Sequence, residues 1–169
     1  MDILKVALEW AKDEIFSSTF FMIFGGLFIL GSVGFWQIGR TDLAKAYVIP
    51  TLVAGLLLMI IGVGLFFTNK SRAANFPIAY EESRTAFVQS ELDRAEKTIK
   101  EFQNVVFKAI PLIIVASALL VFFIESSRWR AIGIVTIALM VVILLIDTNS
   151  SQRMVEYHKE LKAWEAQDD

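Results

Sequence analysis

Apolar residues gather in four long runs along this chain, and polar segments divide the runs into two pairs. The runs cover residues 15–38, 47–67, 107–124 and 131–146. A helix rises about 1.5 Å per residue, so each run is about long enough to cross the roughly 30 Å hydrocarbon core of a bilayer. We therefore expect an all-α integral membrane protein whose four transmembrane helices form two hairpins.

The polar stretch between the two pairs carries a helical pattern of its own. Its apolar residues alternate spacings of four and three, as in the seam of a coiled coil. These residues are Val88, Leu92, Ala95, Ile99, Phe102 and Val106. Pro77 suits the first turn of a helix, because the N–H that it lacks would be unpaired there anyway. We expect one helix over residues 77–106 that continues into the third span, with a bend at Pro111.

The tail, residues 150–166, repeats this spacing after the fourth span. Counted outwards from the second hairpin turn, Leu92 and Leu161 lie about equally far along the chain, as do Lys108 and Asp147. The third and fourth helices should therefore extend into the cytoplasm as an antiparallel coiled-coil-like pair. We also expect an ion pair between Lys108 and Asp147 at the membrane boundary. The tail seam is Met154, Tyr157, Leu161 and Trp164.

Residues 1–14 form a short amphipathic pattern before the first span. Leu4, Leu8 and Ala11 recur at helical spacing with charged residues between them. A segment of this kind beside a span is expected to lie in the membrane interface, where Trp10 would anchor it.

The basic residues predict the orientation of the spans. Of the sixteen Lys and Arg residues, only Arg40, Lys45, Arg128 and Arg130 lie at the two hairpin turns. Because cytoplasmic segments are enriched in Lys and Arg, both termini and the central stretch are expected in the cytoplasm. The compact chain shows no recognisable targeting signal, which favours a bacterial inner (plasma) membrane.

Small residues recur seven apart in the first two spans, at Gly25 and Ser32 and at Gly55 and Gly62. Such stripes let helix backbones approach closely in lipid. Two interpretations stay open. The stripes either pack within the first hairpin or form a seam between copies of the chain.

The sequence offers little chemistry for catalysis or binding. Cysteine is absent, and His158 is the only histidine, with Glu156 and Glu160 on different sides of its helix. No charged residue lies near the middle of a span, where it would indicate an ion path. We expect His158 to be a solvated surface residue, and we expect no catalytic, cofactor-binding or metal site. The net charge of −2 also argues against a nucleic-acid partner.

These observations favour a non-enzymatic accessory, scaffold or regulatory protein that acts through its cytoplasmic helical hairpin. Besides the lipid bilayer, its partner would be a cytoplasmic protein or further copies of itself, and no small-molecule substrate is inferred. The alternative is an oligomeric ion channel or pore-former, and a lipid-modifying enzyme is the weakest of the three. Joint exposure of Phe76, Tyr80 and Phe87 would indicate a docking patch and favour the first interpretation.

Overall fold

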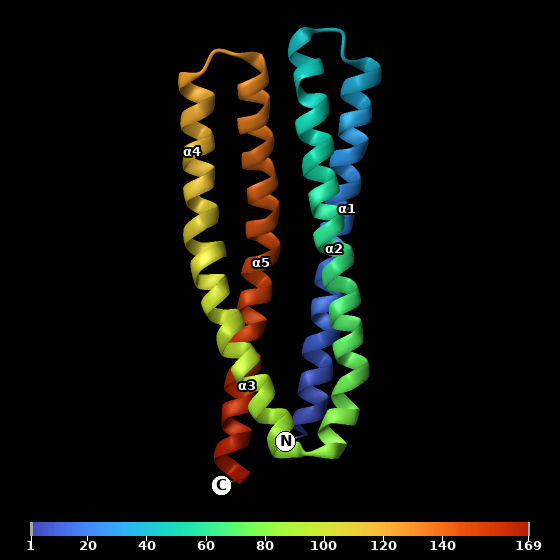
Figure 1. Ribbon diagram of the computed structural model, residues 1–169, viewed down its shortest axis with the longest axis vertical. Coiled ribbons are helices and arrows are strands. Elements are labelled where there is room, and N and C mark those ends of the chain that lie inside the picture. Colours follow the sequence, from blue (N-terminus) through green and yellow to red (C-terminus); the bar gives the residue numbers. More distant parts are fainter. Residues whose placement is uncertain (1, 169) are drawn as a thin grey trace.

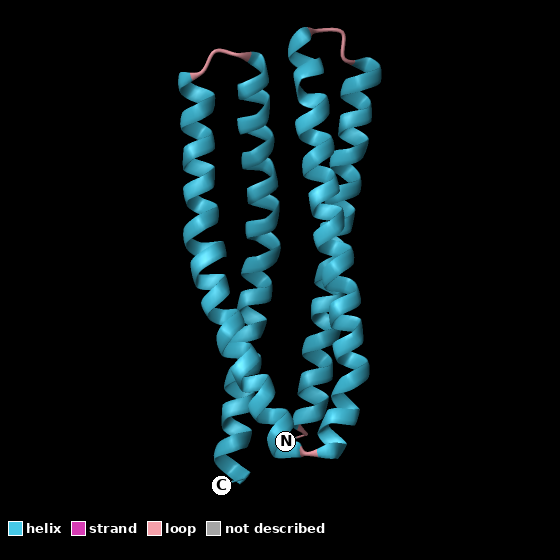
Figure 2. Ribbon diagram, viewed as in Figure 1, coloured by secondary structure: helices cyan, strands magenta, loops and turns pink. Residues whose placement is uncertain are grey.

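The structure, a computed structural model, describes residues 2–168, and these residues form helices joined by short turns (Figure 2). Four continuous helical rods are long and apolar enough to cross a membrane, which confirms the all-α class and the four long apolar helices. The elements are α1 (Ile3–Ile38), α2 (Asp42–Glu82), α3 (Arg84–Glu101), η1 (Phe102–Ala109), α4 (Ile110–Phe123) and α5 (Ser127–Asp168). The third rod consists of α3, the π-helical segment η1 and α4 in succession.

The four rods stand as two hairpins side by side, α1 with α2 and α4 with α5 (Figure 1). Both hairpin turns, residues 39–41 and 124–126, lie at one end of the molecule, which we call the tips. The opposite end, which we call the base, holds both ends of the chain, the turn at Ser83 and α3. From that turn α3 crosses to the second hairpin and runs beside the C-terminal part of α5.

The first hairpin is packed so closely at Gly25, Gly55 and Gly62 that these glycines have no room for a side chain. A Cβ atom on Gly55 would lie 2.8 Å from the carbonyl oxygen of Gly25, and one on Gly62 would lie 2.9 Å from the backbone nitrogen of Met22. The Ser32 hydroxyl also donates to the carbonyl oxygen of Val48 at 2.7 Å. The small-residue stripes therefore pack α1 against α2 within one molecule.

Two apolar cores hold the hairpins together. The middle core joins α1, α2 and α5 and includes Phe21, Leu58 and Ile146. The core at the base joins α1, α2, α3 and α5. Its buried residues are Ile3, Ala7, Trp10, Ala11, Phe76, Phe87, Val88, Leu92, Ala95, Met154, Tyr157 and Leu161. Leu92 and Leu161, predicted at matching heights, are thus buried in the same core.

Residues 1–14 were expected to form a separate interfacial helix, but the described part of this segment belongs to α1. Helix α1 runs from Ile3 to Ile38 without interruption. The side chains of Ile3 and Ala7 are fully buried, and Trp10 is 6% exposed. The expectation was wrong because the apolar face of this segment packs on α3 and α5, which are remote in sequence.

The expected helix start at Pro77 is also wrong, since α2 continues through Pro77 to Glu82. The chain turns instead at Ser83, whose backbone is extended and whose hydroxyl accepts a hydrogen bond from the backbone N–H of Ala86 at 3.3 Å. Serine is a preferred N-cap because it satisfies one of the free N–H groups of the first turn. This turn folds α3 back across the base.

A π-helical segment, η1, lies just before Pro111 in the third rod. At its C-cap the backbone N–H of Ile110 donates to the carbonyl oxygen of Val105, five residues earlier. A π-helix widens the turn and so changes the direction in which later side chains point. Lys108 is exposed and donates from Nζ to Oδ1 of Asn104 at 3.0 Å. The predicted ion pair with Asp147 is therefore wrong, because the count of residues assumed a regular α-helix.

Candidate functional site

A buried polar cluster joins α1, α3 and α5 at the base. Arg94 donates from Nε to Oε1 of Glu91 at 2.9 Å and from Nη2 to Oε2, so the two side chains form a bidentate pair. The Tyr157 hydroxyl donates to the same Oε2 at 2.9 Å. The Arg94 guanidinium lies 4.3 Å from the ring centroid of Trp10, and the Trp10 ring stacks on Tyr157 at 5.2 Å. We call Trp10, Glu91, Arg94 and Tyr157 the base cluster.

Burial and the neighbouring Glu91 together shift the pKa values of Tyr157 and Arg94 in the base cluster. Burial raises the pKa of the Tyr157 phenol, and the charge of Glu91 raises it further, so the hydroxyl remains a donor. Burial lowers the pKa of Arg94, but the hydrogen bonds and charge of Glu91 outweigh this effect and leave it raised. Glu91 and Arg94 therefore neutralise each other, and the phenol adds no charge. The cluster is suited to fixing helices in place rather than to proton transfer.

A second polar link joins the two hairpins nearer the apolar parts of α1 and α5. Arg153 of α5 donates to Oε1 of Glu14 in α1 from Nε at 3.0 Å and from Nη2 at 2.9 Å. The same Nη2 donates to the hydroxyls of Ser17 at 2.7 Å and Ser150 at 3.0 Å. The sequence pattern gave no signal for this link, because its two helices are far apart along the chain.

His158 was expected to be solvated, but its side chain is only 16% exposed and faces α3. Its Nε2 lies 3.5 Å from Oε1 of Glu96, and Nζ of Lys162 lies 3.4 Å from the same oxygen. Lys162 and then His158 lower the pKa of Glu96 through hydrogen bonding and charge. The partner of His158 is thus on the neighbouring helix, not among the glutamates of its own helix. Within the described residues, no group of three His, Cys, Asp or Glu side chains is arranged to hold a metal ion.

The three aromatic residues that would have formed a docking patch are packed on one another instead. Phe76 is 6% exposed and Phe87 is 3% exposed, and their rings meet edge to face at 5.5 Å. Tyr80 meets Phe87 in the same manner at 5.8 Å. The turn at Ser83 brings Phe87 back onto Phe76, so these residues do not form a jointly exposed patch.

A cleft of about 930 Å³ separates the hairpins near the tips. Its walls come from the first part of α2 and the first part of α5, and most of the side chains that line it are apolar. Polar and charged residues lie only towards the tips, apart from Thr136. They are Asp42, Lys45, Ser127 and Arg128. No sequence motif marks this cleft. Its shape depends on how far α2 and α5 stand apart near the tips, and the sequence of one helix does not reveal that distance.

A second hollow, of about 580 Å³, lies between α2 and α3 at the base. Arg72 and Glu91 are among its lining residues, and Nη1 of Arg72 donates to Oδ1 of the buried Asn69 at 2.8 Å. Burial lowers the pKa of Arg72, and the nearby charge of Arg94 lowers it further. This hollow is an extension of the polar network at the base.

Comparisons of the chain with protein-family models, with curated proteins and with solved structures gave no match. The geometry of the described residues is therefore the basis for inferring function. That geometry consists of a base joined by polar contacts and a cleft that opens between the tips.

Proposed function

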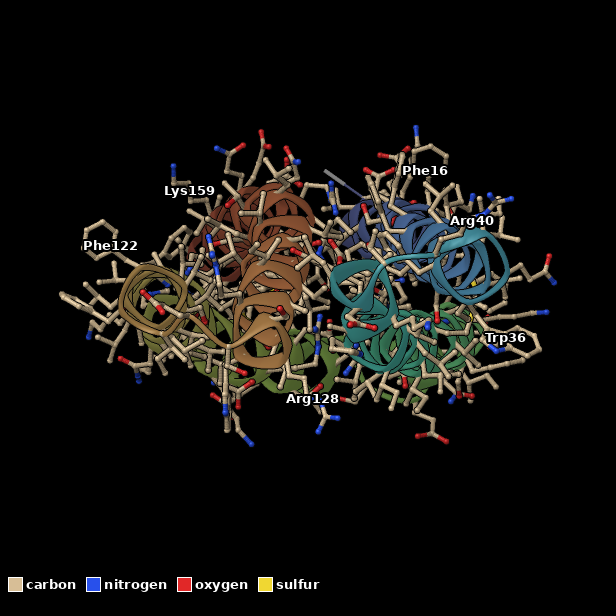
Figure 3. All side chains as sticks on the ribbon, turned by 90° about the horizontal axis from the view of Figure 1, so that it is seen from above. Phe16, Trp36, Arg40, Phe122, Arg128 and Lys159 are labelled. Atoms are coloured by element: carbon tan, nitrogen blue, oxygen red, sulfur yellow. The ribbon has the colours of Figure 1, made fainter. Side chains whose placement is uncertain are left out.

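We propose that this chain is a four-span protein of a bacterial inner membrane with both termini in the cytoplasm. The main support is the apolar surface of the rods away from the base. On α4, Leu112 is 70% exposed, Phe122 is 81% exposed and Phe123 is 74% exposed. Apolar faces of this size are stable in hydrocarbon but promote aggregation in water. Figure 3 shows Phe16 of the first hairpin and Phe122 of the second hairpin both pointing outwards from the molecule.

Within the membrane protein so proposed, the base acts as a non-enzymatic scaffold or regulatory platform in the cytoplasm. The observation that carries this proposal is the base cluster, which fixes α1, α3 and α5 in one arrangement outside the spans. A rigid platform presents its surface without a large ordering cost on binding. The buried aromatic residues do not supply that surface, so we assign partner contact to the exposed charged face of α3. This face carries Gln89, Asp93, Lys97 and Lys100, all of which are exposed.

The alternative of an oligomeric channel receives less support. Its candidate seams between copies were the stripes of small residues in the first hairpin. Gly25, Gly55 and Gly62 already contact the neighbouring helix of the same molecule. We therefore prefer the platform.

The experiment is cross-linking in living cells with a photoreactive residue at position 89 of the full chain. We expect one adduct of defined mass, whose protein component is then identified by mass spectrometry. The charge reversals Lys97→Glu and Lys100→Glu should remove the adduct, because they invert the charge of the α3 face. Lys159→Glu is the matched control, because Lys159 is exposed on α5, where Figure 3 shows it at the edge of the molecule.

Two outcomes would contradict the platform. One is that position 89 yields no adduct while the protein is present in the membrane fraction. The other is an adduct that survives both α3 reversals, which would place the contact elsewhere. A photoreactive residue at position 40, in a hairpin turn, should give no adduct with the same protein.

A further inference from the structure

The cleft between the hairpins has the depth of one membrane leaflet. Its lining runs along α2 from Asp42 to Leu57 and along α5 from Ser127 to Leu139. At about 1.5 Å per residue, the part of the α2 wall from Lys45 to Leu57 is about 18 Å long, somewhat more than half of a hydrocarbon core of roughly 30 Å. The cleft therefore begins at the tips and ends near the middle of the spans.

Its floor is apolar and closed. Ala54 is 2% exposed, Val135 is 7% exposed and Leu139 is 8% exposed. These three residues belong to the middle core that joins α2 to α5. The rims project further, with Ile49 72% exposed and Ile132 40% exposed. A hydrocarbon chain on this floor would contact mostly apolar side chains.

The mouth of the cleft is basic. Lys45 of α2 and Arg128 of α5 both line it, together with the carboxylate of Asp42. Together these three side chains carry one net positive charge. Within the described residues, neither Lys45 nor Arg128 takes part in an ion pair. Figure 3, which looks down on the tips, shows Arg128 on the side of the second hairpin that is near α2.

Basic groups above an apolar trough match one class of molecule. A phospholipid has a phosphate at the membrane boundary and acyl chains below it, and Arg and Lys both bind phosphate. A volume of about 930 Å³ also lies within the range of about 300–1,000 Å³ that is typical of ligand pockets. A helix from a second copy would fill the trough but would bring no phosphate to the two cations.

We propose that the cleft binds one phospholipid from the leaflet at the tips. Its phosphate lies between Lys45 and Arg128, and one acyl chain lies along Ala54, Val135 and Leu139. The contacts at the base hold the hairpins together at that end, while the rods stand apart at the tips (Figure 1). This site rests on the membrane insertion proposed above, but not on the partner of the α3 face.

The test is native mass spectrometry of the full-length protein after purification from membranes. The protein is stripped of lipid and then mixed with phosphatidylglycerol or phosphatidylethanolamine in detergent, and inorganic phosphate serves as a separate probe. We expect one retained phospholipid per chain and no retained phosphate ion. The double variant Lys45→Gln/Arg128→Gln should weaken retention at least tenfold. The matched control is Arg40→Gln/Arg130→Gln, because both arginines are at the tips but neither lines the cleft.

A second variant tests whether the apolar floor of the cleft holds the acyl chain, without changing a charge. Val135→Trp should fill the floor and remove the lipid while Lys45 and Arg128 remain. Circular dichroism checks that each variant has the helix content of the native protein. If Val135→Trp fails to fold, the smaller substitution Val135→Leu takes its place.

Three results would overturn the lipid site. The first is a wild-type protein that retains no phospholipid, and the second is a Lys45→Gln/Arg128→Gln variant that retains as much as its control. The third is a dimer that Val135→Trp dissociates, which would assign the cleft to a second copy. A protein that fractionates with membranes but fails these tests leaves the four-span proposal standing. A failed cross-link at position 89 leaves the lipid site standing.

Discussion

Arg153 and Glu14, which lie 139 positions apart in the sequence, are joined by two hydrogen bonds to a single carboxylate oxygen, at 3.0 and 2.9 Å. The Arg153 side chain is 27% exposed and that of Glu14 is 14% exposed, so the pair is largely shielded from water. Because Glu14 is on α1 and Arg153 is on α5, this contact fixes the first hairpin against the second.

Removing one partner of this pair should destabilise the protein more than removing both. Arg153→Met leaves the carboxylate of Glu14 buried without its cation, at a cost of about 2 kcal/mol. The double variant Glu14→Met/Arg153→Met should recover part of that loss. Thermal unfolding in detergent, followed by circular dichroism, measures both. The exposed Lys5–Glu9 pair is the control, and an equal loss in Glu9→Met would show that burial is not the cause.

Tyr157 should make the protein sensitive to alkaline pH. Its folded pKa is raised above the ordinary value of 10.0, so its contribution to stability is complete below pH 10 and is lost as pH rises further. Tyr157→Phe should cost roughly 1.5–3 kcal/mol at neutral pH, because it removes a hydrogen bond to a charged carboxylate. The variant should also lose part of the alkaline drop in unfolding temperature. An unchanged alkaline drop in Tyr157→Phe, or an equal effect from Tyr80→Phe, would contradict this origin.

Two glycines separated by one residue should respond in opposite ways to the same substitution. A Cβ on Gly62 would lie 2.8 Å from Cγ of Met22 and 2.9 Å from its backbone nitrogen, whereas one on Gly64 would meet no atom within 4 Å. Gly62→Ala should therefore push α1 away from α2 and cost about 1–3 kcal/mol. Gly64→Ala should be neutral or slightly stabilising, since alanine favours helix. Denaturant titration in detergent compares the two, and equal stabilities would argue against close packing at Gly62.

The orientation can be tested cleanly because the chain has no cysteine. We expect a membrane-impermeant maleimide to label Thr41→Cys and Ser126→Cys on intact cells, because the tips should face outwards. Thr85→Cys, at the base, should react only after the cells are permeabilised. The reverse pattern would invert the orientation. Labelling of all three in intact cells would contradict a base that is sealed in the cytoplasm.

Much of the helical layout could be predicted from local pattern. Hydrophobic runs and the alternating spacing are properties of neighbouring residues. The four rods and the burial of Leu92 and Leu161 could therefore be predicted from the sequence. The spacing of glycines also narrowed where α1 and α2 approach each other. Only the structure decided that these glycines pack within one molecule.

The remaining features depend on contacts between distant segments. Trp10 is compatible with a membrane interface until α3 and α5 cover it, and Pro77 is compatible with a helix start until α2 is seen to pass through it. The π-helical segment has no local signature in the sequence, yet it contains Lys108, whose hydrogen-bond partner is Asn104. The cleft at the tips could not be predicted from the sequence for the same reason, since its shape depends on how the two hairpins are arranged.

The core at the base contains both Ile3 and Leu161, so two segments that are remote in the sequence complete one structure. During synthesis the whole first hairpin leaves the ribosome long before Leu161 does. Until then, the apolar side chains of Ile3, Ala7 and Trp10 lack α3 and the end of α5 and are open to other contacts. A chain that is cut before Met154 would therefore leave these side chains uncovered, although all four apolar helical runs would be present.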